Sequence, residues 1–116
     1  MPLRLAVLIS GGGSNLQSII DRVEDGSLDA EIRLVFSNNP GAGGLERARR
    51  HDIPALALDH THHPTRESFD QAMVDAICKA GADTVALAGF MRLVTPTFLN
   101  AGKARRRWTF RVRSSP

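Results

Sequence analysis

Residues 8–20 read LISGGGSNLQSII, and this stretch decides the fold. Residues 3–9 (LRLAVLI) are almost continuously apolar, which is typical of a strand buried on both faces of a parallel sheet. They run into Gly11-Gly12-Gly13, called the glycine loop below. After this loop, apolar residues recur at the spacing of a helix: Leu16, Ile19, Ile20 and Val23. The stretch therefore predicts a strand, a loop and a helix, with Ser14 or Asn15 as the N-cap of the helix.

The same alternation continues along the chain. Further strands are predicted at 32–36, 55–58 and 84–87, and a second helix is predicted over 44–52. A third helix is predicted between an N-cap at Thr65 and a stop at Gly81, with a buried face made by Phe69, Ala72, Met73, Ala76, Ile77 and Ala80. Four strands separated by three helices indicate an α/β fold, a Rossmann-like doubly wound parallel sheet that we expect to be incomplete.

Ligands of such sheets bind beyond the carboxyl ends of the strands. The candidate loops at that edge are 10–15, 37–44, 59–65 and 88–95. A short fourth helix is predicted after Thr95-Pro96, because threonine is a good N-cap and proline suits the first turn.

Composition narrows the class of protein. The chain has 116 residues, of which 42% are hydrophobic, and this predicts one small folded domain. The single cysteine, Cys78, excludes an internal disulfide and favours a reducing cytoplasm; we expect it to be a buried structural thiol. No apolar run has the roughly 20 residues of a membrane span, and the first residues do not resemble a secretory signal. We expect a soluble, cytoplasmic protein without a membrane partner.

Charge divides the chain in two. Residues 1–102 hold nine basic and all twelve acidic residues, whereas residues 103–116 hold six basic residues and no acid. We therefore predict one domain over 1–101, whose family resemblance makes it a nucleotide-binding domain, and a separate basic tail over 102–116.

The glycine loop predicts a phosphate site. A loop between a strand and a helix N-terminus presents unpaired N–H groups at the positive end of the helix dipole. Glycine suits it because a Cβ would block close approach and because some positions need a positive φ. Leu16 replaces the third glycine of a dinucleotide fingerprint, and no nucleoside-triphosphate loop sequence is present. We expect Gly13, Ser14 and Asn15 to hold a terminal phosphate; the alternative is that the glycines only form a tight turn.

Four motifs, read in order, show a resemblance to a known family. They are SGGGSNLQ at 10–17, FSN at 36–38, GLERA at 44–48 and LAGFMRL at 87–93. Together they resemble the phosphoribosylglycinamide formyltransferase (glycinamide ribonucleotide transformylase) family, and the resemblance covers residues 3 to about 101.

The resemblance implies formyl transfer from 10-formyltetrahydrofolate to the amine of phosphoribosylglycinamide in de novo purine biosynthesis. It implies that Gly13, Ser14 and Asn15 bind the substrate phosphate. It also implies that folate lies against Arg66 and the segment Met91, Arg92, Leu93 and Val94. The alternatives are a solvated first-turn residue for Arg66 and ordinary core packing for Met91 and Leu93.

The family's catalytic segment is missing from the sequence. The family uses an Asn-x-His-Pro segment and a more distant aspartate, but Trp108 and Phe110 occupy the asparagine and histidine positions in an ungapped alignment. The sequence therefore predicts no catalytic residue, and it indicates a truncated, out-of-frame or artificial end.

Two other readings stay open. In the first alternative, the chain is a non-catalytic phosphoribosyl-binding fragment that self-associates through exposed apolar surface. In the second, the chain binds nucleic acid with the basic tail. Three histidines, His60, His62 and His63, lie in one candidate loop, but they lack the spaced partners of a metal site, so no metal is expected.

Overall fold

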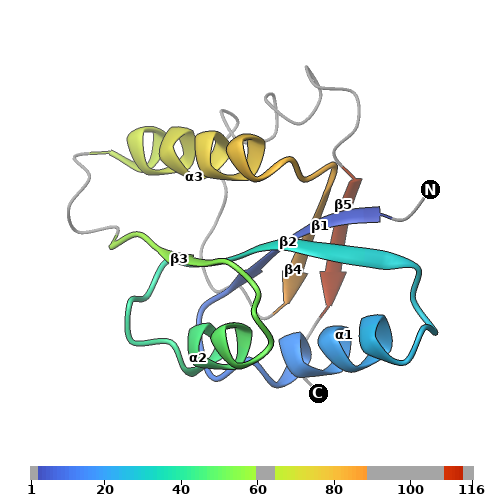
Figure 1. Cartoon of the computed structure of the whole chain (residues 1–116). Helices are drawn as coiled ribbons and strands as arrows, with labels where there is room; N and C mark the ends of the chain where they lie inside the picture. The colour runs from blue at the N-terminus through green and yellow to red at the C-terminus, as the bar shows by residue number, and fades with distance from the viewer. Residues whose placement is uncertain (1–2, 60–64, 89–108, 114–116) are drawn as a thin grey trace.

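The computed structural model describes residues 3–59, 65–88 and 109–113. Strands and helices alternate along the chain as far as residue 88, as expected, and Figure 1 shows their arrangement. They are β1 (Leu3–Ile9), α1 (Ser14–Glu24), β2 (Ala30–Ser37), α2 (Gly43–Arg50), β3 (Ala55–Ala57), α3 (Arg66–Ala80), β4 (Thr84–Ala88) and β5 (Thr109–Arg113).

One parallel sheet joins the strands in the order β3-β2-β1-β4-β5. From β1 the chain winds outward through β2 to β3, and then it returns to the other side of β1 for β4. The strand order therefore reverses between β1 and β4, which confirms the doubly wound topology. In open α/β sheets this reversal is the place where ligands bind, beyond the carboxyl ends of the strands. The glycine loop directly follows β1 at this position.

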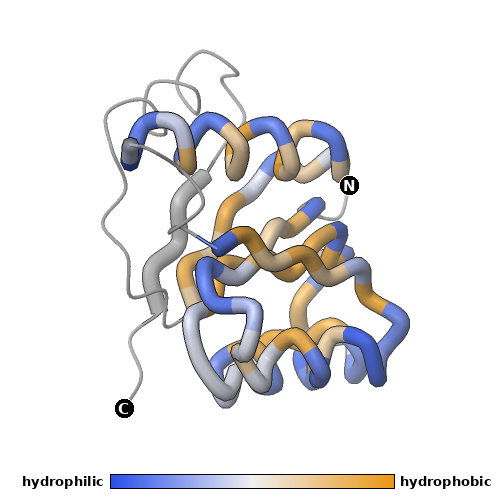
Figure 2. The backbone as a smooth tube through the Cα atoms, turned by 90° about the vertical axis from the view of Figure 1, so that its left-hand side faces the viewer, coloured by the Kyte–Doolittle hydropathy of each residue, from blue (hydrophilic) through white to orange (hydrophobic). Residues whose placement is uncertain are grey.

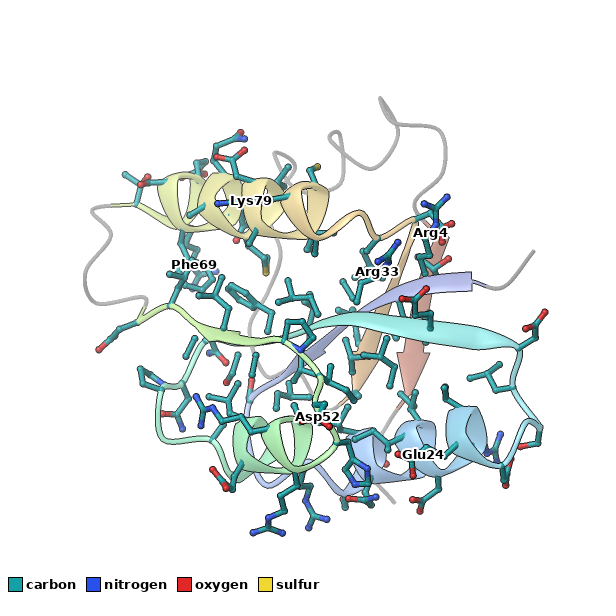
Figure 3. The ribbon with its side chains drawn as sticks, viewed as in Figure 1. Arg4, Glu24, Arg33, Asp52, Phe69 and Lys79 are labelled. Carbon is teal, nitrogen blue, oxygen red and sulfur yellow. The ribbon has the colours of Figure 1, made fainter. Side chains whose placement is uncertain are left out.

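Helices cover both faces of the sheet. Figure 1 shows α1 and α2 below it and α3 above it. The lower core is built around Val7, Ile9, Leu16, Ile20 and Leu45, and the upper core includes Leu8, Phe36, Phe69, Met73 and Ile77. Figure 2 shows hydrophobic colour along the central strands, and β1 contributes side chains to both cores. Figure 3 shows Phe69 between α3 and the sheet, where its ring meets Phe36 edge to face at a centroid distance of 6.0 Å.

The caps of α3 confirm local sequence signals. Thr65 is the N-cap, and its hydroxyl accepts a hydrogen bond from the N–H of Ser68 at 3.0 Å. Gly81 ends the helix in the left-handed conformation with φ +78°. The predicted buried face is right at Phe69, Met73 and Ile77, whereas the predicted alanines are only half-buried.

Two features of the fold differ from the sequence predictions. The N-cap of α1 is Gly13, at φ 83° and ψ 29°, with no side-chain cap, so the prediction of Ser14 or Asn15 is wrong. The left-handed conformation explains why glycine takes this place. The sequence also does not predict β5, which pairs in parallel with β4 from within the basic segment. The helix expected after Thr95-Pro96 lies outside the described residues.

The amino-terminal edge of the sheet is fixed by Asp83. Its carboxylate accepts a hydrogen bond from the N–H of Arg4 at 3.0 Å and lies 3.5 Å from the Arg4 guanidinium. Burial alone would raise the pKa of Asp83, but the N–H of Arg4, the hydroxyl of Thr84 and the Arg4 charge together lower the pKa below its ordinary value. This contact ties β1 to the start of β4 at the edge opposite the glycine loop.

Candidate phosphate-binding site

The first turn of α2 packs directly on the glycine loop. The N–H of Gly44 donates to the carbonyl of Gly11 at 3.1 Å. A Cβ on Gly13 would stand 2.7 Å from the Cα of Gly44, and a Cβ on Gly44 would overlap the Ile9 side chain. Neither glycine can therefore be replaced without moving backbone or core. This close approach brings together two of the candidate loops, 10–15 and 37–44.

All three carbonyls of the glycine loop have a donor. Gly11 accepts from the N–H of Gly44, and Gly13 accepts from the N–H of Gln17 at 2.8 Å in the first turn of α1. The carbonyl of Gly12 accepts from the Nε of Arg47 at 2.7 Å. The carbonyl oxygens, which would repel an anion, are thus all engaged by protein groups.

The direction of the N–H groups follows from these bonds. The peptide units are trans, so the N–H of each unit points away from its carbonyl. The N–H groups of Gly12 and Gly13 therefore face away from α2, and that of Ser14 points out of the N-terminus of α1. Within the part of the chain that the structure describes, none of these three N–H groups donates a hydrogen bond to protein. Such a set of donors at a helix N-terminus suits a phosphate or another anion.

The glycine loop is exposed, so a ligand can reach it. Gly11, Gly12 and Ser14 are exposed, and a Cβ at Gly11 or Gly12 would meet nothing within 4 Å. Asn15, in contrast, is only 9% exposed, so its amide side chain is set into the protein beside the loop.

The reason for glycine differs along the loop. The expectation that some positions need a positive φ is confirmed at Gly13, with φ +83°. The close approach at Gly13 is to Gly44 of α2, so packing within the protein already requires glycine there, whether or not a ligand is bound.

Side chains hold the two loops together at their base. The Ser10 hydroxyl, at the end of β1, donates to the Oδ1 of Asn38, just after β2, at 2.7 Å. The loop after β2 is itself fixed, because the Asn39 side chain accepts from the N–H of Gly41 at 3.0 Å. Asn38 of the FSN segment therefore anchors the second loop to the first, and Asn39 shapes the second loop.

The other predicted site residues are partly outside the described residues. Arg66 is the first residue of α3 and is exposed. Met91, Arg92, Leu93 and Val94 are not described, and neither are Trp108 and the three histidines. Phe110 lies in β5, where it pairs with Val85 of β4. Cys78 is half-buried against the upper core, so the expectation of a buried thiol is only partly right.

A cavity of ≈ 200 Å³ lies away from the glycine loop. Its walls come from α1, β2 and the segment after α2, and they are mostly apolar. The Nδ1 of His51 and the Oε2 of Glu24, 2.7 Å apart, stand at this cavity. We assign the candidate site to the glycine loop because its donor geometry, and not its volume, is specific for a ligand.

Across residues 3–59, 65–88 and 109–113, no group of three or more His, Cys, Asp or Glu side chains could hold a metal ion. No helix within the same ranges is long and apolar enough to cross a membrane.

Comparison with known proteins identifies the family. Residues 3–106 match the Formyl transferase family, and the chain belongs to it. The trifunctional purine biosynthetic protein adenosine-3 of Chironomus tentans is 42% identical over 104 residues, which are 88% of this chain and 8% of that protein. The phosphoribosylglycinamide formyltransferase of Escherichia coli is 42% identical over 98 residues, which are 84% of this chain and 46% of that protein.

Solved structures agree with the sequence relatives. Glycinamide ribonucleotide transformylase 1 of Symbiobacterium toebii superposes with a TM-score of 0.85 at 41% identity, over 92% of this chain and 50% of that chain. The described chain thus shares the fold of the formyltransferases, and it spans about half the length of the single-function relatives.

Sequence reasoning missed three residues that shape the site: Gly44, Arg47 and Gln17. Gly44 and Arg47 lie in the GLERA motif, which supported the family resemblance but received no role. The available signal was the second glycine pair, Gly43-Gly44, at the start of a helix on the same edge as the glycine loop.

Proposed function

We propose that this chain provides the phosphoribosyl-binding part of a folate-dependent phosphoribosylglycinamide formyltransferase. The reaction moves a formyl group from 10-formyltetrahydrofolate to the amine of phosphoribosylglycinamide in de novo purine biosynthesis. One observation about the glycine loop carries the proposal. The carbonyls of Gly11 to Gly13 all accept hydrogen bonds from protein groups, whereas the neighbouring N–H groups donate none within the described residues. These N–H groups lie at the reversal point of the sheet, where a phosphate can accept from them.

The substrate phosphate is bound by Gly13, Ser14 and Asn15 in this proposal. Gly13 and Ser14 contribute their N–H groups, together with the positive end of the α1 dipole. The Ser14 hydroxyl is exposed and can donate to the same phosphate, and the amide of Asn15 closes the inner side of the site.

The folate lies against Arg66 and the segment Met91 to Val94 in the same proposal. Arg66 begins α3, which follows β3 at the carboxyl edge of the sheet, the edge that also carries the glycine loop. Its exposed guanidinium can pair with a carboxylate of the folate tail.

Formyl transfer also needs a catalytic group. The amine attacks the formyl carbon and creates an oxyanion, which requires preorganised donors, and a proton must move between nitrogens. Trp108 and Phe110 cannot serve as acid or base for that proton. We therefore propose that the 116-residue chain binds the phosphorylated substrate but does not transfer formyl alone. The cytoplasm, where purine synthesis takes place, is the proposed setting.

Thermal unfolding with different ligands tests the phosphate assignment. A ligand that binds only the folded state at about 100 times its Kd adds roughly 2.7 kcal/mol to the unfolding free energy. Phosphoribosylglycinamide should therefore raise the Tm, whereas the matched compound without the phosphate should leave it nearly unchanged. Equal protection by the two compounds would remove the phosphate site.

A formyl-transfer assay tests the catalytic part separately. The chain, given 10-formyltetrahydrofolate and phosphoribosylglycinamide, should show only the background rate. Turnover above background would refute the claim that this chain lacks a catalytic group, and it would leave the phosphate assignment intact.

A further inference from the structure

Arg47 is the side chain that reaches the glycine loop from α2. Its Nε donates to the carbonyl of Gly12 at 2.7 Å, across 35 residues of sequence. Its Nη1 donates to the Oε1 of Gln17 at 3.2 Å. The guanidinium is planar and rigid, so two bonds from one fork fix its position far better than one bond would.

Gln17 connects this contact to α1. Its Nε2 donates to the Oδ1 of Asp21 at 2.9 Å, one turn along the helix. Arginine can only donate and a carboxylate can only accept, so the two partners fix the orientation of the Gln17 amide. The N–H of Gln17 also holds the carbonyl of Gly13. Arg47 and Gln17 together thus hold two successive peptide units of the loop.

The peptide between Gly12 and Gly13 needs such a support. Both flanking residues are glycines, so side-chain sterics do little to restrict rotation of this unit. Gly12 is exposed, and a Cβ there would meet nothing within 4 Å, so packing restricts this unit only on the side of Gly13, which lies against α2. A rotated unit would point the Gly12 oxygen, and not the Gly13 N–H, toward the phosphate. The hydrogen bond from Arg47 opposes this rotation, since rotation would break it.

We propose that Arg47 is a positioning residue of the phosphate site, and this proposal rests on the proposed function. Arg47 keeps the Gly12–Gly13 peptide in the orientation that turns the Gly13 N–H toward the phosphoryl group. It acts through the loop backbone and is not itself a ligand of the phosphate.

The test uses matched arginine variants of the whole chain. Arg47→Met removes the donors and one positive charge but keeps most of the aliphatic stem. Arg50→Met removes the same charge from an exposed position of α2. Arg47→Lys keeps the charge but loses the fork. Ribose 5-phosphate is the ligand, with affinity measured by titration calorimetry, and residual dipolar couplings report the direction of the Gly13 N–H in the free protein.

We expect Arg47→Met and Arg50→Met to differ in both affinity and couplings. Loss of a hydrogen bond to a charged group is expected to weaken binding by about 10- to 100-fold in Arg47→Met. The Gly13 N–H changes direction in the same variant, and Arg47→Lys is also weakened. Arg50→Met keeps the parent affinity and the parent couplings.

Each other outcome has a definite meaning. Equal affinity and equal couplings in Arg47→Met and Arg50→Met would overturn the role of Arg47 while the phosphate site stands. Weaker binding with unchanged couplings, restored by Arg47→Lys, would make Arg47 a direct charge partner and would also overturn it. If the parent chain does not bind ribose 5-phosphate but the couplings of Arg47→Met change, Arg47 still orients the Gly12–Gly13 peptide, whereas the proposed phosphate site fails.

Discussion

Replacement of Gly13 by alanine should destabilise the protein for two separable reasons. The backbone φ of +83° is one that a residue with a Cβ adopts at a cost of about 1–2 kcal/mol. The new Cβ would also stand 2.7 Å from the Cα of Gly44 and 3.3 Å from the Cδ of Arg47. Relieving a contact with backbone of this kind costs about 1–3 kcal/mol. Gly13→Ala is therefore expected to lose about 2–5 kcal/mol, a large share of the roughly 5–15 kcal/mol of a typical domain.

Gly26 provides the matched control. Its φ is also +83°, but a Cβ there would meet nothing within 4 Å. Gly26→Ala therefore has the cost of a positive φ without the contact with α2. The reduced conformational freedom of the unfolded chain is the same in both variants. The difference between the two variants isolates the contact at about 1–3 kcal/mol. A second control, Gly12→Ala, has neither the positive φ nor the close contact. Its free energy of unfolding should be within about 0.5 kcal/mol of that of the parent.

Urea unfolding followed by circular dichroism measures these differences as free energies of unfolding. We expect Gly12→Ala to be the most stable of the three variants, followed by Gly26→Ala and then Gly13→Ala. If Gly13→Ala were no less stable than Gly26→Ala, the close packing of α2 on the glycine loop would be refuted.

Three further predictions concern the rest of the fold. Thr65→Ala should lose about 1 kcal/mol in urea unfolding, because α3 loses its side-chain cap; Thr65→Ser should restore it, and an equal loss in both would rule out the cap. The lowered pKa of Asp83 means that its contribution to stability is present above the ordinary value of 3.8 and disappears as pH falls through the lower folded value. Asp83→Asn should therefore be less stable than the parent at pH 7 and should approach it in acid, and a constant gap in unfolding free energy from pH 7 to 2 would contradict this. Phe69→Ala removes a fully buried ring packed on Phe36 and should lose about 3–5 kcal/mol in the same unfolding assay, whereas Leu56→Ala at an exposed position should change little.

The features that the sequence predicts well are local. An apolar run marks β1, the spacing of Leu16, Ile19 and Ile20 marks the buried face of α1, and Thr65 and Gly81 mark the ends of α3. Each of these signals depends on residues within one or two helical turns, so a single sequence is enough to read it.

The features that the sequence does not predict depend on distant partners. β5 exists as a strand because its backbone pairs in parallel with β4, across a long connection, while its own residues look like part of a basic tail. The contact of Gly13 with Gly44 joins two loops, and Arg47 reaches Gly12 across 35 residues. A glycine that must be glycine because of a neighbouring helix cannot be distinguished, in sequence, from one that makes room for a ligand.

A crystal structure of this chain with bound phosphoribosylglycinamide would show whether the glycine loop holds the phosphate. We expect phosphate oxygens at about 2.7–3.2 Å from the main-chain nitrogens of Gly13 and Ser14, with the Gly12 carbonyl still bonded to Arg47. A phosphate bound at another place, or a Gly12 carbonyl turned toward the ligand, would contradict this expectation.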